Sequence, residues 1–291
     1  MKEVRWYPGN MARTMRRLRE DLRVIDLVVE LRDARVPRSS HNPRLADLIA
    51  GKEQLVLLHK ADQAENSATE RWLAYLESRG IPAMAYSVHR QRSLTSLMRF
   101  LNGKARSLLP YRIKRPLRIM IVGIPNVGKS TLINHLVKRG VAPTGNRPGI
   151  TRGKQWIRLL PGVELLDTPG VLWPDLSPET VLPLGVVGAL PPEVVGGEKL
   201  ALWLLEAFVR RGKAGRLSRR YPGAEPEHQP PEIFLEHIGQ RLGCLLPGGK
   251  VDRERAAALL LKDFQGGGLG PLTLEEPPLP EEEEAQGEED V

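Results

Sequence analysis

Short apolar runs alternate with amphipathic stretches over the first 173 residues of this 291-residue chain. Four of these runs predict buried strands, because they are short, rich in aliphatic residues and bounded by polar or turn-forming positions: Gln54–Leu58, Pro82–Ala85, Leu117–Ile121 and Val163–Leu166. Thr131–Val137 predicts a helix, as does Asn10–Arg23, where Met11, Met15, Leu18 and Leu22 share one stripe. This alternation is typical of an α/β domain that has a mostly parallel sheet and helices on both faces.

The alternation stops after Trp173. Apolar residues then recur at helical spacing in Glu198–Arg211, in Pro231–Leu242, and in a stretch that Asp252 would cap and that includes Phe264. We therefore predict two domains, residues 1–173 and 174–274, of which the second is small and all-α. Trp203, Phe208 and Phe264 fit the core of this second domain better than a surface for stacking bases.

Charge divides the chain in another way. The net charge is +8, but nine of the 35 acidic residues and none of the 43 lysines and arginines lie from Glu275 onward, so residues 1–274 carry +17. Residues 275–291 are rich in Pro and Glu, and we expect a disordered acidic tail there. The basic body favours a polyanion such as RNA, although a generally solvated or heat-stable surface is the alternative.

Two segments concentrate the basic residues. One is the predicted helix Asn10–Arg23, and the other is a segment that Gly212 and Gly215 predict to be loop-like: Arg210, Arg211, Lys213, Arg216, Arg219 and Arg220. Either segment is a candidate for contact with phosphate, or else a solvated face.

Composition excludes several other classes of protein. Cys244 is the single cysteine, so the chain forms no internal disulfide, which fits a reducing cytosol. The histidines and the cysteine show no zinc-ligand spacing. Because no apolar run has the length of a membrane span and the N-terminus lacks the apolar core of a signal peptide, we expect a cytoplasmic protein with no membrane partner.

A phosphate-binding loop lies between a predicted strand and a predicted helix. Gly123–Ser130 reads GIPNVGKS and matches G-x-x-x-x-G-K-[ST] at every position. Backbone N–H groups at the start of the helix favour the β-phosphate of a nucleotide. We expect Lys129 to reach the β- and γ-phosphates and Ser130 to ligate Mg²⁺. Asn126, Val127, Gly128 and Thr131 complete the nucleotide-binding set on this loop.

Two later motifs fit the γ-phosphate and the metal ion. Asp167-Thr168-Pro169-Gly170 follows a predicted strand and has the D-x-x-G pattern, in which Asp167 would hold Mg²⁺ through water and the N–H of Gly170 would contact the γ-phosphate. Between the two phosphate motifs lies Pro148-Gly149-Ile150-Thr151. The hydroxyl of Thr151 would supply a further Mg²⁺ ligand and sense the γ-phosphate.

A base-reading motif comes earlier in the chain. His59-Lys60-Ala61-Asp62 resembles the N-K-x-D guanine motif, in which Asp62 would accept hydrogen bonds from guanine N1–H and N2–H₂, and Lys60 would lie along the ring. The usual first residue is Asn, which ties this loop to the phosphate loop, and here it is His59. Ser87 and Val88 occupy the expected place of the second base-contacting loop. An ordinary strand-to-helix turn with a capping aspartate is the alternative.

The motifs stand in the order base motif, second base loop, phosphate loop, threonine segment and D-x-x-G. Because ordinary small GTPases begin with the phosphate loop, we expect a circularly permuted P-loop GTPase domain, joined through Gly103–Pro116 and opened just after D-x-x-G. GTP or GDP and Mg²⁺ are the expected ligands. The γ-phosphate-sensing loop then runs directly into the helical region.

The chain resembles the ribosome biogenesis GTPase A family. The resemblance begins at Trp6–Met11, continues through Leu31–Pro37 and Ser39–Pro43, and follows family order through the motifs above to Leu166–Pro174, with Gly243–Leu245, Gly248-Gly249 and Asp263-Phe264 in the helical region. It implies a cytoplasmic, bacterial-type GTPase that binds the precursor of the 50S subunit through ribosomal RNA in its GTP state, acts late in assembly and is released by hydrolysis. We expect a monomer off the ribosome. The acidic tail lies outside the resemblance.

Catalysis shows departures from common GTPases. Asn10 stands where many family members carry a histidine thought to aid hydrolysis, and an amide can orient water but cannot accept its proton. Val171, after D-x-x-G, can do neither. We therefore expect slow intrinsic turnover that the ribosome stimulates, with Asn10, Thr151 and Gly170 as the candidate catalytic residues.

The side-chain carbonyl of Asn126 would help to hold a potassium ion against the phosphates, an expectation that rests partly on GTPases with a similar Asn. The alternative is that Asn126 only braces the loop through hydrogen bonds. Two other functions stay open on the sequence alone: an RNA-modification GTPase, and a nucleotide-responsive RNA-binding module with negligible turnover.

Overall fold

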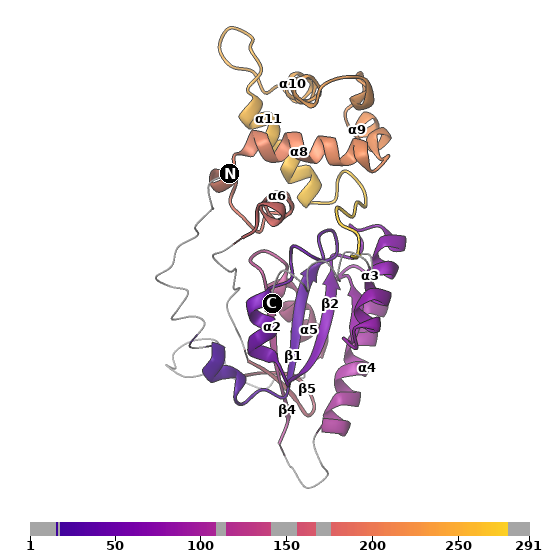
Figure 1. The fold of residues 1–291 in the computed structure, drawn as a ribbon, viewed down its shortest axis with the longest axis vertical. Helices are drawn as coiled ribbons and strands as arrows, with labels where there is room; N and C mark the ends of the chain where they lie inside the picture. Colours follow the sequence, from indigo (N-terminus) through magenta and orange to yellow (C-terminus); the bar gives the residue numbers. More distant parts are fainter. Residues whose placement is uncertain (1–15, 17, 109–114, 141–155, 167–175, 279–291) are drawn as a thin grey trace, which may run out of the picture.

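The computed structural model describes residues 16, 18–108, 115–140, 156–166 and 176–278, and consists of a sheet domain and a helical domain stacked along the long axis of the molecule (Figure 1). The elements of the sheet domain are β1 (Leu27–Asp33), α2 (Pro43–Ile49), β2 (Glu53–His59), α3 (Asn66–Ser78), β3 (Ala83–Tyr86), α4 (Gln91–Leu108), β4 (Leu117–Gly123), α5 (Lys129–Gly140), β5 (Trp156–Leu160) and β6 (Val163–Leu166).

The six strands form one sheet in the order β3-β2-β1-β4-β6-β5, and every neighbouring pair is parallel except β5 and β6. This confirms the mostly parallel sheet that the sequence predicts. The four expected strands are β2, β3, β4 and β6. The sequence analysis did not predict the central strand β1, because charged residues interrupt its apolar pattern. One of them, Glu30, is buried and pairs with Arg32 at 2.8 Å and with His41 at 2.9 Å.

Helices cover both faces of the sheet, as expected. On one face, Leu27, Val29 and Leu31 of β1 join a core with the buried leucines of α4 and α5. On the other face, Val28 packs with Ile49 of α2 and with Leu22, which lies in the described helical residues of the expected Asn10–Arg23 helix. Since both faces are covered, β1 is buried along its whole length.

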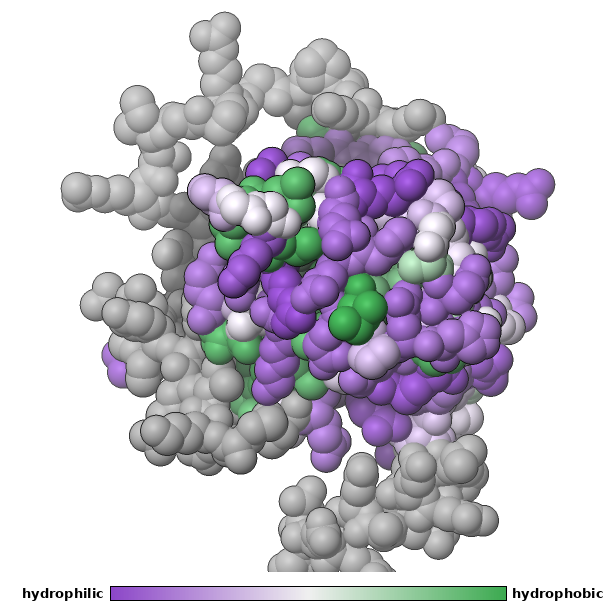
Figure 2. Space-filling view, turned by 90° about the horizontal axis from the view of Figure 1, so that it is seen from above, coloured by the Kyte–Doolittle hydropathy of each residue, from purple (hydrophilic) through white to green (hydrophobic). Residues whose placement is uncertain are grey.

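The helical domain is built around α8. Its elements are α6 (Pro178–Val186), α7 (Pro192–Val195), α8 (Gly197–Arg210), α9 (Ala214–Arg220), α10 (Pro231–Arg241) and α11 (Arg253–Gln265), with a 3₁₀ turn at Pro226–His228. Phe208 and Phe264 are buried edge to face at 6.2 Å, whereas Trp203 is only partly buried. Asp252 caps α11 by accepting from the N–H of Arg255 at 3.0 Å. The outer face of this domain is mostly hydrophilic, with scattered apolar side chains (Figure 2).

The segment expected to be loop-like contains a helix. In α9, Ala214 and Leu217 are buried three residues apart, and this anchoring face stabilises the turn despite Gly215. Gly212 instead ends the preceding stretch, with a positive φ of 63° that suits glycine. Arg216, Arg219 and Arg220 therefore occupy fixed positions on one short helix.

The chain returns from the helical domain to the sheet domain after α11 (Figure 1). The N–H of Leu272 donates to the carbonyl of Gln63 at 2.9 Å, and the N–H of Leu274 donates to that of Arg35 at 2.8 Å. The indole N–H of Trp72 donates to the carbonyl of Glu275 at 3.1 Å. Residues 272–274, expected in the helical domain, thus pack on the first domain.

The start of the acidic tail also differs from expectation. Glu275, the first residue of the predicted disordered segment, accepts from the backbone N–H groups of Arg38 at 2.7 Å and Ser39 at 3.1 Å. Glu276 pairs with Arg71 and Arg211 at 2.7 and 2.6 Å. A composition rich in Glu and Pro does not reveal such specific partners. Residues 279–291 lie outside the described part of the chain, as does the predicted boundary at residues 173 and 174.

Candidate nucleotide-binding site

The phosphate loop connects β4 to α5 at the carboxyl edge of the parallel strands. Its last glycine, Gly128, has a φ of 107°, and a Cβ there would lie 2.4 Å from the ring of His59. A Cβ on Gly123 would lie 2.6 Å from the carbonyl oxygen of Leu31. Both glycines are therefore required by close approach to the neighbouring strands β2 and β1.

Lys129 is buried at the start of α5. Its ammonium donates to the carbonyl oxygens of Gly123 at 3.0 Å and Ile124 at 2.7 Å, and it has no carboxylate partner among the described residues. Burial lowers the pKa of Lys129 to about 8. A desolvated cation at a helix N-terminus fits a phosphate group, whose charge would offset the cost of burial.

A hollow of about 440 Å³ opens above this loop. Pro125, Asn126, Gly128, Lys129, Ser130 and Thr131 line it. Ser130 and Thr131 are exposed there, which suits contact with a metal ion or phosphate, while the side chain of Val127 is buried in the core. Val127 can therefore contact a nucleotide only through its backbone.

His59 ends β2 and lies against the phosphate loop. Its ring touches Gly128, as the glycine geometry shows, and stacks on Tyr86 with the centroids 5.9 Å apart. Burial lowers the pKa of His59 to about 4, so the ring is neutral at pH 7. The contact that an asparagine would make by hydrogen bonding is replaced here by ring packing.

Lys60 joins the base motif to two other strand ends. It has a positive φ of 58°, and its ammonium lies 3.0 Å from a carboxylate oxygen of Asp33 and 3.3 Å from the carbonyl oxygen of Asn126. Because β1 lies between β2 and β4, the end of β1 is adjacent to both motif-bearing loops. The structure thus brings the expected base motif and phosphate loop together.

Asp33 and Arg35 hold this arrangement, and the motif analysis gave them no role. The guanidinium of Arg35 donates to both carboxylate oxygens of Asp33, at 2.9 and 2.8 Å, in a fully buried pair. Burial alone would raise the pKa of Asp33, but Arg35 and Lys60 more than offset this and hold it well below its usual range. Charged residues directly after the largely aliphatic stretch at residues 27–31, which itself includes Glu30, were the signal available in the sequence.

Arg35 also reaches the helical domain. Its Nη1 donates to the carbonyl of Phe264 at 3.3 Å, and its guanidinium lies 5.0 Å from the centre of the Phe264 ring. A second link starts from the phosphate loop, where the side-chain amide of Asn126 donates to the carbonyl of Gly188 at 2.8 Å. The site is therefore bonded to the turn after α6 and to the end of α11.

Asp62 is partly exposed beside a hollow of about 330 Å³. The second base loop lies next to it, because the N–H of Ala61 donates to the carbonyl of Tyr86 at 3.1 Å. Ser87 is buried, and its hydroxyl accepts from the N–H of His89 at 3.1 Å, while Val88 is half-buried. The hollow also contains Arg216 from the helical domain.

Four predicted site residues lie outside the described residues: Asn10, Thr151, Asp167 and Gly170. Of the predicted Mg²⁺ ligands, the described part of the chain therefore includes Ser130 alone. No group of three or more metal-ligating side chains occurs among the described residues. Within the same residues, no helix is long and apolar enough to cross a membrane.

Comparison with known protein families gives one match within this site. Residues 118–187, which include all of β4 but its first residue, the phosphate loop and α6, match the family described as 50S ribosome-binding GTPase. The matched segment thus starts at the strand before the phosphate loop and ends at the turn that Asn126 contacts.

Curated relatives match over nearly the whole chain. Ribosome biogenesis GTPase A of Bacillus licheniformis is 38% identical, covering 94% of this chain and 98% of its own length. The protein of the same name from Thermotoga maritima is 32% identical over 94% of each chain, and mitochondrial ribosome-associated GTPase 1 of Mus musculus is 32% identical over 95% of this chain and 91% of its own.

Solved structures give the same picture. The GDP-bound structure of a Thermotoga maritima protein, YlqF, superposes with a TM-score of 0.69 at 28% identity, covering 90% of this chain and 99% of that one. The GNP-bound structure of YlqF gives a TM-score of 0.66 over 91% of this chain.

Proposed function

Because the chain belongs to the ribosome biogenesis GTPase A family of circularly permuted GTPases, we propose that it binds the precursor of the large ribosomal subunit through ribosomal RNA in its GTP state, late in assembly, and leaves it after hydrolysis. The observation that carries this proposal is the double link from the nucleotide site to the helical domain, through Asn126 and Arg35. A domain that is bonded to the phosphate loop can respond to the nucleotide that the loop holds.

The phosphates are held by the chain's own groups. The ammonium of Lys129, which now donates to two loop carbonyls, would bind the β- and γ-phosphates, and the backbone N–H groups from Asn126 to Ser130 would bind the same anion. Ser130 would hold Mg²⁺ together with Thr151 and Asp167, and the N–H of Gly170 would contact the γ-phosphate. The metal ion, when bound, supplies positive charge against the charge that develops during transfer.

Guanine recognition is proposed for Asp62, with Lys60 along the ring and Ser87 and Val88 beside it. A carboxylate accepts from both guanine N1–H and N2–H₂, whereas adenine leaves it unpaired. The position of Asp62, partly exposed and next to the second base loop, supports this role.

Potassium is proposed as a further ligand at Asn126. Since the amide nitrogen donates to Gly188, the carbonyl oxygen of the same side chain is the atom left to hold a cation against the phosphates. Such a cation would place charge where other GTPases place an arginine finger. Asn10 is retained as a candidate that orients water.

Contact with RNA is proposed for the basic body, which carries +17 over residues 1–274, with α9 as one contact. Polyanion binding of this kind is electrostatic and weakens steeply as salt rises. We also propose a cytoplasmic protein that is monomeric off the ribosome.

The test is multiple-turnover GTP hydrolysis measured with and without precursor and mature 50S particles, combined with sedimentation of the protein on these particles. We expect slow turnover alone, stimulation by particles, and retention on precursors with a non-hydrolysable GTP analogue but not with GDP. Equal retention in both nucleotide states would overturn the proposed cycle. Crosslinking with mapping of the RNA would then identify the helices that are contacted.

A further inference from the structure

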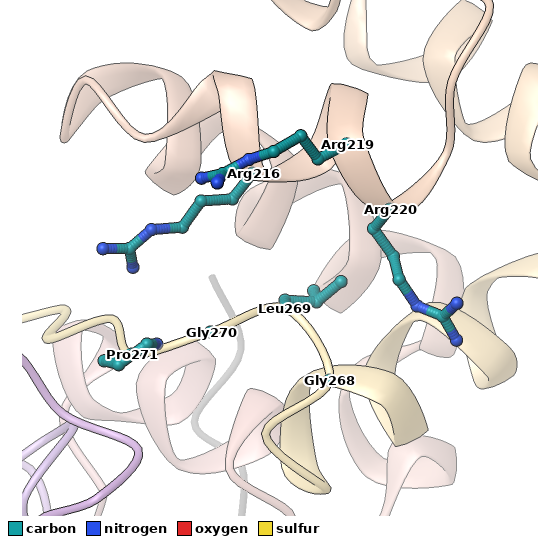
Figure 3. A pocket seen from close by; sticks show the side chains of 7 residues that line it. All are labelled: Arg216, Arg219, Arg220, Gly268, Leu269, Gly270 and Pro271. Carbon is teal, nitrogen blue, oxygen red and sulfur yellow. The ribbon is translucent and has the colours of Figure 1, made fainter.

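A basic hollow lies between α9 and the chain that follows α11. It has a volume of about 530 Å³ and is lined by Arg216, Arg219, Arg220 and the segment Gly268–Pro271 (Figure 3). We refer to it as the arginine hollow. It shares no lining residue with the hollow above the phosphate loop, and it shares Arg216 and Pro271 with the hollow beside Asp62.

Two of its three arginines form no ion pair with an acidic side chain among the described residues. Arg220 is neutralised by Asp263, with Nε 2.6 Å from the carboxylate. Arg219 donates only to the carbonyl of Gly215 in its own helix, at 3.3 Å, and Nη1 of Arg216 is buried without a hydrogen-bond partner. The nearby carboxylate of Glu65 forms its ion pair with Lys213 at 2.7 Å and interacts with Arg216 only through its charge.

The geometry of these side chains suits an anion. Figure 3 shows the guanidinium groups of Arg216 and Arg219 extending to the same end of the hollow, while Arg220 turns the other way. Two like charges at one end of a recess repel each other, and a carboxylate or phosphate placed between them relieves this repulsion. Arginine pairs with either group through two parallel hydrogen bonds.

The acidic end of the chain begins beside this surface. Glu276 already pairs with Arg211, which is the C-cap of α8 and stands five positions before Arg216. The path from Pro271, at the hollow, to Pro278 is at most about 24 Å, because an extended chain spans about 3.4 Å per residue. The following residues to Glu288–Asp290 span about 34–40 Å by the same measure, so these carboxylates can reach the hollow.

We propose that residues 279–291 bind in the arginine hollow through their seven acidic side chains, Glu281 to Glu284, Glu288, Glu289 and Asp290, with Arg216 and Arg219 as the main partners. The tail then occupies with carboxylates a surface that also fits RNA phosphates. The docking follows from the charges of the arginine hollow and of the acidic residues, and from the distance that the chain after Pro271 can span. Its consequence, that the tail competes with RNA, rests on the proposed function.

Docking can be tested without RNA by placing a spin label on the tail. The variant Gln286→Cys carries a nitroxide, and the natural Cys244 is buried, which protects it from labelling. At about 50 mM salt, where screening is weak, the label should broaden the amide signals of residues 214–220 and 266–270, and at about 500 mM salt this broadening should vanish.

Two double variants decide whether the contact is specific. Arg216→Gln with Arg219→Gln should abolish the broadening. Arg92→Gln with Arg99→Gln removes two exposed arginines of α4, which also have no ion pair among the described residues, and should leave the broadening intact. The docking would be overturned if the labelled protein that keeps all of its arginines showed no broadening, or if both double variants showed equal broadening.

Competition is tested with a chain that ends at Pro278 and keeps the placed residues Glu275 and Glu276. It should bind a short single-stranded RNA about tenfold more tightly than the full chain at low salt, because phosphates gain the two arginines. Replacing Arg216 and Arg219 should cancel this gain. If the spin label shows docking but the full and shortened chains bind RNA with equal affinity, the competition is refuted. RNA binding by neither form would refute the proposed function and leave the docking intact.

Discussion

His59 shows how one residue can hold two loops together by shape. Its ring fills the space above Gly128 that a hydrogen-bonding side chain would otherwise bridge, and it does so in the neutral form because burial lowers its pKa to about 4. The unfolded chain, in contrast, protonates this histidine near pH 6.5. The folded state therefore loses stability as the pH falls between these two values.

The expected loss of stability is measurable. Between pH 7 and pH 5, His59 becomes protonated in the unfolded state but stays neutral in the folded state. This difference lowers the free energy of unfolding by about 2 kcal/mol. Urea unfolding of the wild type should show this loss beyond that of His59→Asn, since the variant has no titrating ring and every other group is the same. Parallel pH profiles for the two proteins would contradict the pKa shift.

Asp62 decides the choice of base if the base motif is assigned correctly. Asp62→Asn should weaken GTP binding by roughly two orders of magnitude, because two charge-assisted hydrogen bonds are lost, and should favour xanthosine triphosphate, whose 2-oxo group accepts from the new amide. Asp62→Ala is the control, as it should lose both nucleotides. Wild-type protein that binds ATP as tightly as GTP would show that the assignment is wrong.

At the scale of elements, the contact between the phosphate loop and the turn after α6 separates two roles of Asn126. Hydrolysis should be faster in KCl than in NaCl at equal ionic strength, and Asn126→Ala should remove the difference. Asn126→Asp keeps a side-chain oxygen but loses the donor to Gly188, so it should retain the preference for potassium at saturating GTP. Equal wild-type rates in both salts, with and without ribosomal particles, would leave Asn126 with its structural role alone.

Strands and helices could be predicted from the sequence where a repeating pattern of apolar residues determines the secondary structure. The runs that became β2, β4 and β6 and the stripes of α8, α10 and α11 depend on local periodicity, and glycines in the phosphate loop depend on local geometry. β1 was missed because it buries the charged residues Glu30 and Asp33. They are neutralised by Arg32 and Arg35 nearby in the sequence, and by His41 and Lys60 from other segments. α9 was missed because two buried residues outweigh the glycines around it.

The same distinction applies to the site. The base motif and the phosphate loop are recognisable from single segments, whereas the contact of Lys60 with Asp33 requires the strand order, which places β1 between them. The bonds from Arg35 to Phe264 and from Asn126 to Gly188 join residues far apart in sequence, and no local pattern encodes them. Likewise, a Glu-rich composition gave no indication that the carboxylate of Glu275 accepts hydrogen bonds from three groups of two neighbouring residues, Arg38 and Ser39.

For the whole molecule, the two links predict that the helical domain senses the nucleotide. Hydrogen exchange in residues 176–278 should differ between GDP and a non-hydrolysable GTP analogue, with the largest changes near Gly188 and Phe264, where the links end. Asn126→Asp should reduce the difference at the first position and keep it at the second. Identical exchange in both nucleotide states, on and off the ribosome, would remove the proposed coupling.

The return of residues 272–276 to the sheet domain has a consequence for how the protein folds during its synthesis. These residues are synthesised after the whole helical domain, yet they bond to Gln63, Arg35 and Trp72, which are synthesised early. Domains generally fold from the N-terminus while the chain is still growing. The nucleotide domain can then build its core during translation, but its border along α3 closes only after the helical domain has also been synthesised. The last part of the nucleotide domain to close is thus a segment that the ribosome makes only after the helical domain.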